Sequence, residues 1–82
     1  EYEMLGAVNL LDFGLAAGIW TENLGRAHRA AQAVEAGRVW INCYNLFPSG
    51  SSFGGTKASG FGREDAFETM YAFTQVKNVI AD

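Results

Sequence analysis

Two short apolar runs with one amphipathic stretch between them most constrain the fold of this chain. The runs are residues 15–20 and 39–41, and neither shows the polar alternation of a strand that faces water. Between them, apolar residues recur every three to four positions over residues 24–34, preceded by two helix-capping residues, Thr21 and Asn23. Strand, helix and strand in this order form a βαβ unit, whose crossover is almost always right-handed. The sequence therefore predicts an α/β fold with a parallel sheet.

Further elements are predicted on both sides of this unit. Apolar spacing predicts a helix over residues 4–11, which the stretch 12–14 ends, and the central helix is expected to close at Gly37. Acidic residues within 64–68 lie where the first turn of another helix would favour negative charge. Residues 73–80 have the composition of a strand, although their apolar positions follow neither period.

Residues 53–64 form a loop whose shape is set by the backbone. Four glycines stand among its twelve residues: Gly54, Gly55, Gly60 and Gly62. Glycine is used where the chain needs a positive φ or a close backbone approach, so these positions favour a path fixed by geometry. The wider loop, residues 42–62, is long for a compact domain, and ordered loops of such length are usually functional.

Composition and charge exclude several classes of function. The chain has 82 residues, a net charge of -3 and no basic stripe, which argues against nucleic acid as a partner. No apolar run approaches the roughly 18 residues of a membrane span, so no membrane partner is expected. The single cysteine permits no internal disulfide and fits a cytoplasmic location. Because the chain opens on Glu1, we interpret it as a fragment or a processed piece.

The residues with the most reactive side chains favour structural roles. Cys43 lacks a base or a positive neighbour in the sequence, and the only histidine, His28, falls on the polar side of the central helix. We interpret Cys43 as a small apolar residue of the core and His28 as a solvated or locally hydrogen-bonded one. Trp20 and Trp40 lie in the apolar runs and are predicted to be core residues.

Two phosphate-binding patterns match the loop incompletely. Residues 50–57 have the glycine separation of a P-loop, but the lysine is one position late. Residues 60–62 begin a dinucleotide fingerprint, but Asp65 takes the place of the third glycine and would repel a pyrophosphate. A phosphate-binding module is therefore a weak functional hypothesis for this chain, and we rank it third, below the two hypotheses that follow.

Three residues of the loop keep two interpretations each. Phe47 and Phe53 flank a Pro-Ser-Gly stretch, and such aromatics either fill the domain's own core or line an apolar pocket. Glu64 is either an acid in the first turn of a helix or, since glycines precede it, a group that a partner can approach.

Three blocks of this sequence resemble the C-terminal end of NAD(P)-dependent aldehyde dehydrogenases. They are residues 13–21, 36–42 and 53–64, and the resemblance extends over residues 3–79. It implies that residues 1–72 are the last part of a catalytic domain. Residues 73–82 would then be the oligomerisation strand of a homo-oligomer.

The resemblance also implies the activity of a parent enzyme. In such enzymes a cysteine thiolate attacks an aldehyde, hydride passes to NAD or NADP, and a glutamate-activated water hydrolyses the thioester to a carboxylic acid. These groups belong to the rest of the chain, and Cys43 does not match the nucleophile. The isolated chain is therefore predicted to be inactive.

Individual site residues are implied by the same resemblance. Phe53 matches a phenylalanine beside the substrate tunnel, and Glu64 matches a glutamate that pairs with a lysine elsewhere as a charge relay. The backbone carbonyls of Lys57 and Gly60 match those that hold a potassium ion between subunits. The loop that shapes the tunnel mouth is matched by Asn45, Leu46 and Phe47.

The segment 42–45 leans towards the betaine-aldehyde-like branch, to which the relay and the potassium site belong. Thr56 departs from a common tyrosine, and residues 10–11 replace a pair that is usually polar. The alternative hypothesis is a stand-alone assembly module that pairs through its C-terminal strand, as exposed strand edges do.

Overall fold

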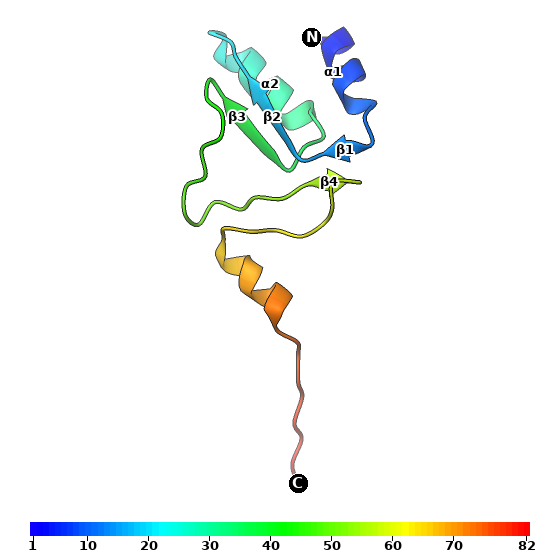
Figure 1. The fold of residues 1–82 in the computed structure, drawn as a ribbon, viewed down its shortest axis with the longest axis vertical. Helices are drawn as coiled ribbons and strands as arrows, with labels where there is room; N and C mark the ends of the chain where they lie inside the picture. The colour runs from blue at the N-terminus through cyan, green and yellow to red at the C-terminus, as the bar shows by residue number, and fades with distance from the viewer.

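The computed structural model describes residues 1–82 as an α/β unit followed by one short helix and an extended terminal segment (Figure 1). The elements in chain order are α1 (Tyr2–Asn9), β1 (Phe13–Gly14), β2 (Ala16–Ile19), α2 (Leu24–Ala33), β3 (Arg38–Ile41), β4 (Thr56–Lys57) and the 3-10 helix η1 (Phe67–Phe73). The molecule is elongated, with extents of 62 × 26 × 20 Å, because its last residues project away from the α/β unit.

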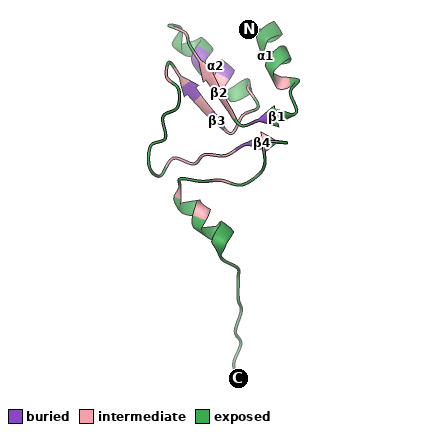
Figure 2. Ribbon diagram, viewed as in Figure 1, coloured by how far each residue is buried: buried purple, intermediate pink, exposed green.

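Strands β2 and β3 pair in parallel, which confirms the predicted parallel unit. Their register starts at Ala16 opposite Arg38. Helix α2 connects the two strands and packs on them through Ala27 and Ala30, which are almost fully buried (Figure 2). Alanine at both contact positions lets the helix lie close to the sheet, since no larger side chain separates them.

The start of α2 follows from its capping residue. Of the two predicted candidates, Asn23 is the N-cap: its side-chain oxygen accepts a hydrogen bond from the Arg26 N–H at 2.9 Å. The Thr21 hydroxyl instead accepts from the Asn23 N–H at 3.1 Å. Such a cap satisfies a donor that the first helical turn leaves free, and it is typically worth about 1 kcal/mol.

The predicted end of α2 at Gly37 is wrong. The helix ends at Ala33, and Gly37 belongs to the approach to β3, where its N–H donates to the carbonyls of Gly14 and Leu15, both at 3.1 Å. The backbone of Gly54 passes against Gly37 so closely that a Cβ at position 37 would overlap the Gly54 carbonyl. The glycine is required by this crossing of two backbones and not by a helix terminus.

A second sheet joins the N-terminal part of the chain to the glycine-rich loop. Strands β1 and β4 pair antiparallel, with Phe13 opposite Lys57 and Gly14 opposite Thr56. The Gly14 N–H also donates to the Ser59 hydroxyl at 2.9 Å. The sequence predicted only the end of a helix over residues 12–14. A two-residue strand is too short to show a periodic pattern, and it is recognised only by its hydrogen bonds to the neighbouring strand.

The core of the chain is small and lies between α2, β2 and β3. Trp40 is only 7% exposed and confirms its prediction as a core residue, whereas Trp20 is 64% exposed and contradicts it. Trp20 directly follows β2, where its ring leaves the sheet and approaches Tyr44 with centroids 6.2 Å apart. Exposed segments dominate α1, η1 and the terminal segment (Figure 2).

Polar contacts hold α1 beside α2. The Glu1 carboxylate pairs with Arg29 at 2.9 Å, and this hydrogen bond lowers the pKa of the Glu1 carboxyl below its usual value. At the other end of α1, the Asn9 side chain donates to the Ala33 carbonyl and accepts from the Glu35 N–H, both at 2.9 Å. Neither α1 nor any other helix is long and apolar enough to cross a membrane.

The C-terminal elements differ from their predictions in two ways. The helix after the loop is the 3-10 helix η1, which starts at Phe67, so Glu68 and not Glu64 lies in its first turn. The strand predicted over residues 73–80 is not formed within the chain: Phe73 ends η1, and the residues that follow pair with no other strand. A strand requires a neighbouring strand for its hydrogen bonds, and this chain supplies none there.

Candidate functional site

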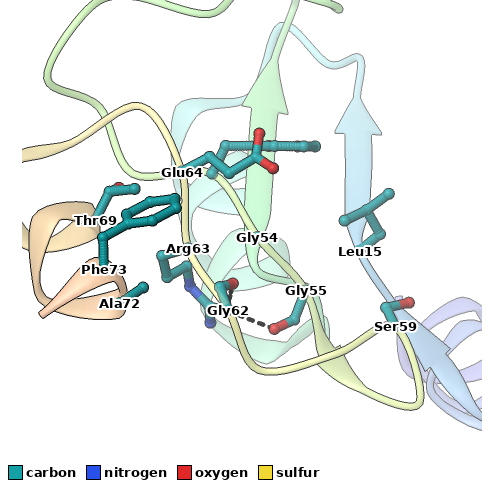
Figure 3. A pocket seen from close by; sticks show the side chains of 11 residues that line it. Leu15, Gly54, Gly55, Ser59, Gly62, Arg63, Glu64, Thr69, Ala72 and Phe73 are labelled. Atoms are coloured by element: carbon teal, nitrogen blue, oxygen red, sulfur yellow. Dashed lines mark hydrogen bonds between the residues drawn. The ribbon is translucent and has the colours of Figure 1, made fainter. Parts of the chain in front are cut away.

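A cavity of about 380 Å³ lies between the glycine-rich loop and η1 (Figure 3). Phe53, Arg63 and Glu64 contribute side chains from the loop, and Phe73 contributes its ring from η1. Leu15, between β1 and β2, closes another part of the wall. The cavity thus combines apolar surface with one acidic and one basic side chain.

The two ends of the loop are fastened to each other beside this cavity. The Phe53 N–H donates to the Glu64 carbonyl at 2.9 Å, and the Glu64 N–H donates to the Phe53 carbonyl at 2.7 Å. The sequence-predicted substrate residue and relay residue are therefore paired through their backbones. Glu64 is therefore held by this backbone pairing within the loop, and it is not an acid in the first turn of a helix.

The glycines of the loop serve different purposes. Gly60 has a φ of +116°, a conformation that side chains rarely adopt. Gly54 and Gly55 lie against other parts of the loop, where a Cβ at position 55 would come within 2.5 Å of the Ser59 Cβ. Gly62 has open space around it and no positive φ. The prediction that this position requires glycine is therefore not supported by the contacts within this chain.

Arg63 crosses the loop and fixes its shape. Its Nη1 donates to the carbonyls of Gly55 at 2.6 Å and Gly62 at 2.9 Å (Figure 3). The neighbouring Glu64 side chain is exposed and makes no hydrogen bond or ion pair within the chain. A backbone held by these hydrogen bonds therefore carries an exposed carboxylate that has no partner within this chain.

The lysine of the loop is not the partner of Glu64. The Lys57 ammonium donates to the carbonyls of Asn9 at 2.9 Å and Leu11 at 3.1 Å, and it forms an ion pair with Glu35. These contacts tie β4 to the C-terminal end of α1, where a cation is favoured by the free carbonyls of the last turn.

The second part of the site is a cluster of aromatic rings around a buried arginine that the sequence analysis did not single out. Arg38, at the start of β3, is only 7% exposed. Its Nη1 donates to the Leu46 carbonyl at 3.2 Å, and its Nη2 donates to the carbonyls of Ser51 at 2.6 Å and Ser52 at 2.8 Å. One sequence signal could have indicated this arginine: it directly precedes a run of residues predicted to be a buried strand, and a buried charge needs hydrogen-bond partners.

The aromatic rings around Arg38 form a continuous row from Tyr44 to Phe53. Ring centroids are 4.7 Å apart for Trp40 and Tyr44, 5.7 Å for Trp40 and Phe47, and 5.0 Å for Phe47 and Phe53. The Arg38 guanidinium carbon lies 5.0 Å from the ring centroids of both phenylalanines. Phe47 and Phe53 are thus brought together, and Phe53 also lines the cavity.

The tunnel-mouth residues predicted beside Phe47 lie on the exposed side of the same loop. Asn45 and Leu46 are both exposed, and Asn45 has a φ of +57°, which asparagine tolerates better than most residues. The Leu46 carbonyl points inward and accepts hydrogen bonds from Arg38 and from the Trp40 indole N–H at 2.9 Å. Backbone contacts therefore hold this loop while its side chains stay accessible.

The remaining candidates show no ligand-binding geometry of their own. No group of three or more His, Cys, Asp or Glu side chains could hold a metal ion. His28 is exposed, as predicted, and Cys43 is half-buried. The Lys57 carbonyl accepts from the Gly60 N–H at 3.3 Å within a tight turn, which places the two predicted potassium ligands on the same short segment.

Comparison with known proteins identifies the family to which this chain belongs. The profile of the aldehyde dehydrogenase family matches residues 1–79. The chain belongs to this family. It is 53% identical over 79 residues to betaine aldehyde dehydrogenase 2 of Rhizobium meliloti (strain 1021), which covers 96% of this chain and 16% of that protein. It is 45% identical over 80 residues to an aldehyde dehydrogenase of Vibrio cholerae serotype O1, covering 98% of this chain and 16% of the relative.

The solved structures of aldehyde dehydrogenases agree with this assignment. The NAD+ complex of the aldehyde dehydrogenase from Bacillus cereus superposes with a TM-score of 0.87 at 43% identity, over 93% of this chain and 16% of that one. The resemblance of the three sequence blocks and the α/β fold class are thereby confirmed. The chain spans about 16% of the length of these relatives, so it corresponds to one part of an aldehyde dehydrogenase.

Proposed function

We propose that this chain is the C-terminal part of an NAD(P)-dependent aldehyde dehydrogenase that oxidises an aldehyde to a carboxylic acid. The observation that carries the proposal is the family match over residues 1–79, in a chain spanning about 16% of its relatives. Support for the coenzyme comes from the relative whose structure is an NAD+ complex. A cytoplasmic location remains a prediction.

The proposed reaction uses groups outside these residues. A thiolate would add to the aldehyde carbon to give a thiohemiacetal, and a bound nicotinamide coenzyme would supply the hydride acceptor for its oxidation to a thioester. Water then hydrolyses the thioester, releases the acid and regenerates the thiol. This chain contributes Phe53 and the loop residues 45–47 to the wall of the substrate tunnel, and Glu64 to a charge relay with a lysine elsewhere in the parent enzyme.

The loop geometry supports these roles in two ways. The backbone pairing of Phe53 with Glu64 holds together the two residues whose ring and carboxylate line one cavity. The side chain of Glu64 has no partner within the chain, as expected of a group that pairs with a residue elsewhere. Fixed positions matter because catalysis depends on the orientation of reacting groups.

A coenzyme-reduction assay tests the proposed function. We expect the full-length parent to reduce NAD+ or NADP+ with an aldehyde panel that includes betaine aldehyde, and the 82-residue chain to be inactive. Running the assay in potassium chloride and in sodium chloride tests the ion site, since the carbonyls of Lys57 and Gly60 are the hard oxygen ligands that potassium prefers. Activity of the isolated chain with any aldehyde, or an inactive parent, would contradict the proposal.

The properties of the terminal segment favour a role in subunit assembly. The alternative function, a stand-alone assembly module, depends on the same segment. Val76 is 99% exposed and Val79 and Ile80 are largely exposed, in a segment that pairs with no strand of the chain. An unpaired extended segment exposes N–H and C=O groups that another chain can pair with. We propose that residues 73–82 add a strand to a second subunit.

Light scattering on two parent variants tests this assembly role. Val76→Pro removes one backbone donor and is expected to lower the molar mass of the oligomer, whereas the matched control Val76→Thr keeps the donor and the oligomer. Equal masses for the two variants would argue against strand pairing at this position. A stand-alone assembly module predicts in addition that the isolated chain self-associates, and a stable monomer at high concentration would exclude it.

A further inference from the structure

Arg38 carries a buried positive charge that no carboxylate of this chain neutralises. Its hydrogen-bond acceptors are the carbonyls of Leu46, Ser51 and Ser52 and the Ser51 hydroxyl, all of them uncharged. The three ion pairs of the chain involve other basic residues. An arginine remains protonated at any physiological pH, so a full positive charge persists at this position.

The charge acts on the site because of where the guanidinium lies. Its carbon is 5.0 Å from the ring centroids of Phe47 and of Phe53, and Phe53 in turn lines the cavity that holds Glu64. With little water around a 7% exposed side chain, a charge interacts over several ångströms more strongly than it would at the surface. A ligand packed against these two rings therefore experiences the field of Arg38.

We infer that Arg38 is a specificity-determining residue that disfavours cationic aldehydes relative to uncharged aldehydes of the same shape. The inference rests on the proposed function, in which Phe47 and Phe53 face the substrate. Betaine aldehyde, named in the relative from Rhizobium meliloti, carries a quaternary ammonium and belongs to the disfavoured class. Glu64 has the opposite sign and partly offsets this field, so the test compares enzymes that differ only at position 38.

The experiment uses the full-length parent and two substrates of equal shape, betaine aldehyde and 3,3-dimethylbutanal. The readout is the ratio of kcat/KM for the cationic substrate over kcat/KM for the uncharged substrate. The two free aldehydes differ in hydration, but this difference is the same for every variant and cancels when the ratios of two variants are compared. We expect Arg38→Gln and Arg38→Met to raise this ratio about tenfold, since they remove the charge, and Arg38→Lys to leave it near the wild-type value. Arg29→Met, at an exposed ion pair on α2, is the control and should not change it.

The outcomes separate specificity from a purely structural role. If Arg38 only held the loop, the lysine and the uncharged variants would lose activity with both substrates by similar factors, and an unchanged ratio would overturn the inference. Should one uncharged variant not fold, the other decides. Dead-end inhibition gives the same comparison: the ratio of Ki for choline over Ki for 3,3-dimethylbutan-1-ol is expected to fall about tenfold from the wild type to an uncharged variant, and an unchanged ratio overturns the inference. An inactive wild-type parent would instead refute the proposed function.

Discussion

Replacing Gly37 by alanine is expected to destabilise the parent enzyme by about 3 kcal/mol or more, because the added methyl group has no space. A Cβ at this position would overlap the Gly54 carbonyl and also contact the Gly55 Cα. Those atoms cannot move away easily, since Gly54 directly follows Phe53, whose backbone is paired with Glu64. The measurements are the yield of folded protein and the midpoint of thermal unfolding.

Gly6→Ala is the matched control for this substitution. Gly6 lies within α1 and has no atom within 4 Å of the added methyl group. Alanine is the better helix former, so this variant is expected to be stabilised by roughly 0.5–1 kcal/mol. Equal unfolding midpoints for the two variants would mean that the crossing of residues 37 and 54 is not as close as the structure describes.

Replacing Glu64 by glutamine is expected to lower kcat of the parent by about 100-fold, at the lower end of what proton-transfer groups contribute. The substitution keeps the size of the side chain and the backbone pairing with Phe53, and it removes only the charge that the proposed lysine partner requires. The protein should therefore fold normally, and steady-state kinetics with a saturating aldehyde is the measurement.

The control for the relay is Glu68→Gln on η1. Glu68 is an exposed acid close in sequence to Glu64, but it does not line the cavity. Its kcat should stay within about twofold of the wild type, as is usual for surface substitutions away from functional features. If both glutamine variants retained the wild-type kcat, Glu64 would have no role in a relay.

The parallel unit could be predicted because its signals are local. Residues 24–34 repeat apolar positions with the helical period, Asn23 supplies the cap, and the runs on either side are too apolar for exposed strands. The end of α2 could not be predicted in the same way. Gly37 looked like a helix terminus, but its glycine is needed for contact with Gly54, which is distant in sequence.

The site was only partly predictable. The roles of Phe53 and Glu64 came from the family resemblance, and they remain proposals, but no pattern indicated that their backbones pair. Trp20 and Trp40 occupy similar apolar runs, yet one is exposed and the other buried, because only Trp40 packs under the loop that Arg38 holds. Burial depends on what lies across the fold, which periodicity does not encode.

The sequence by itself determined the βαβ unit, the cap of α2 and the membership of the aldehyde dehydrogenase family, because helical period, capping and family blocks are properties of neighbouring residues. Only the tertiary structure decided that residues 53 and 64 pair, that β4 joins β1, and that Arg38 lies beneath a row of aromatic rings. These features require loops to close over long stretches of chain. Their energies come from contacts between distant segments, so the positions that make them carry no local signature.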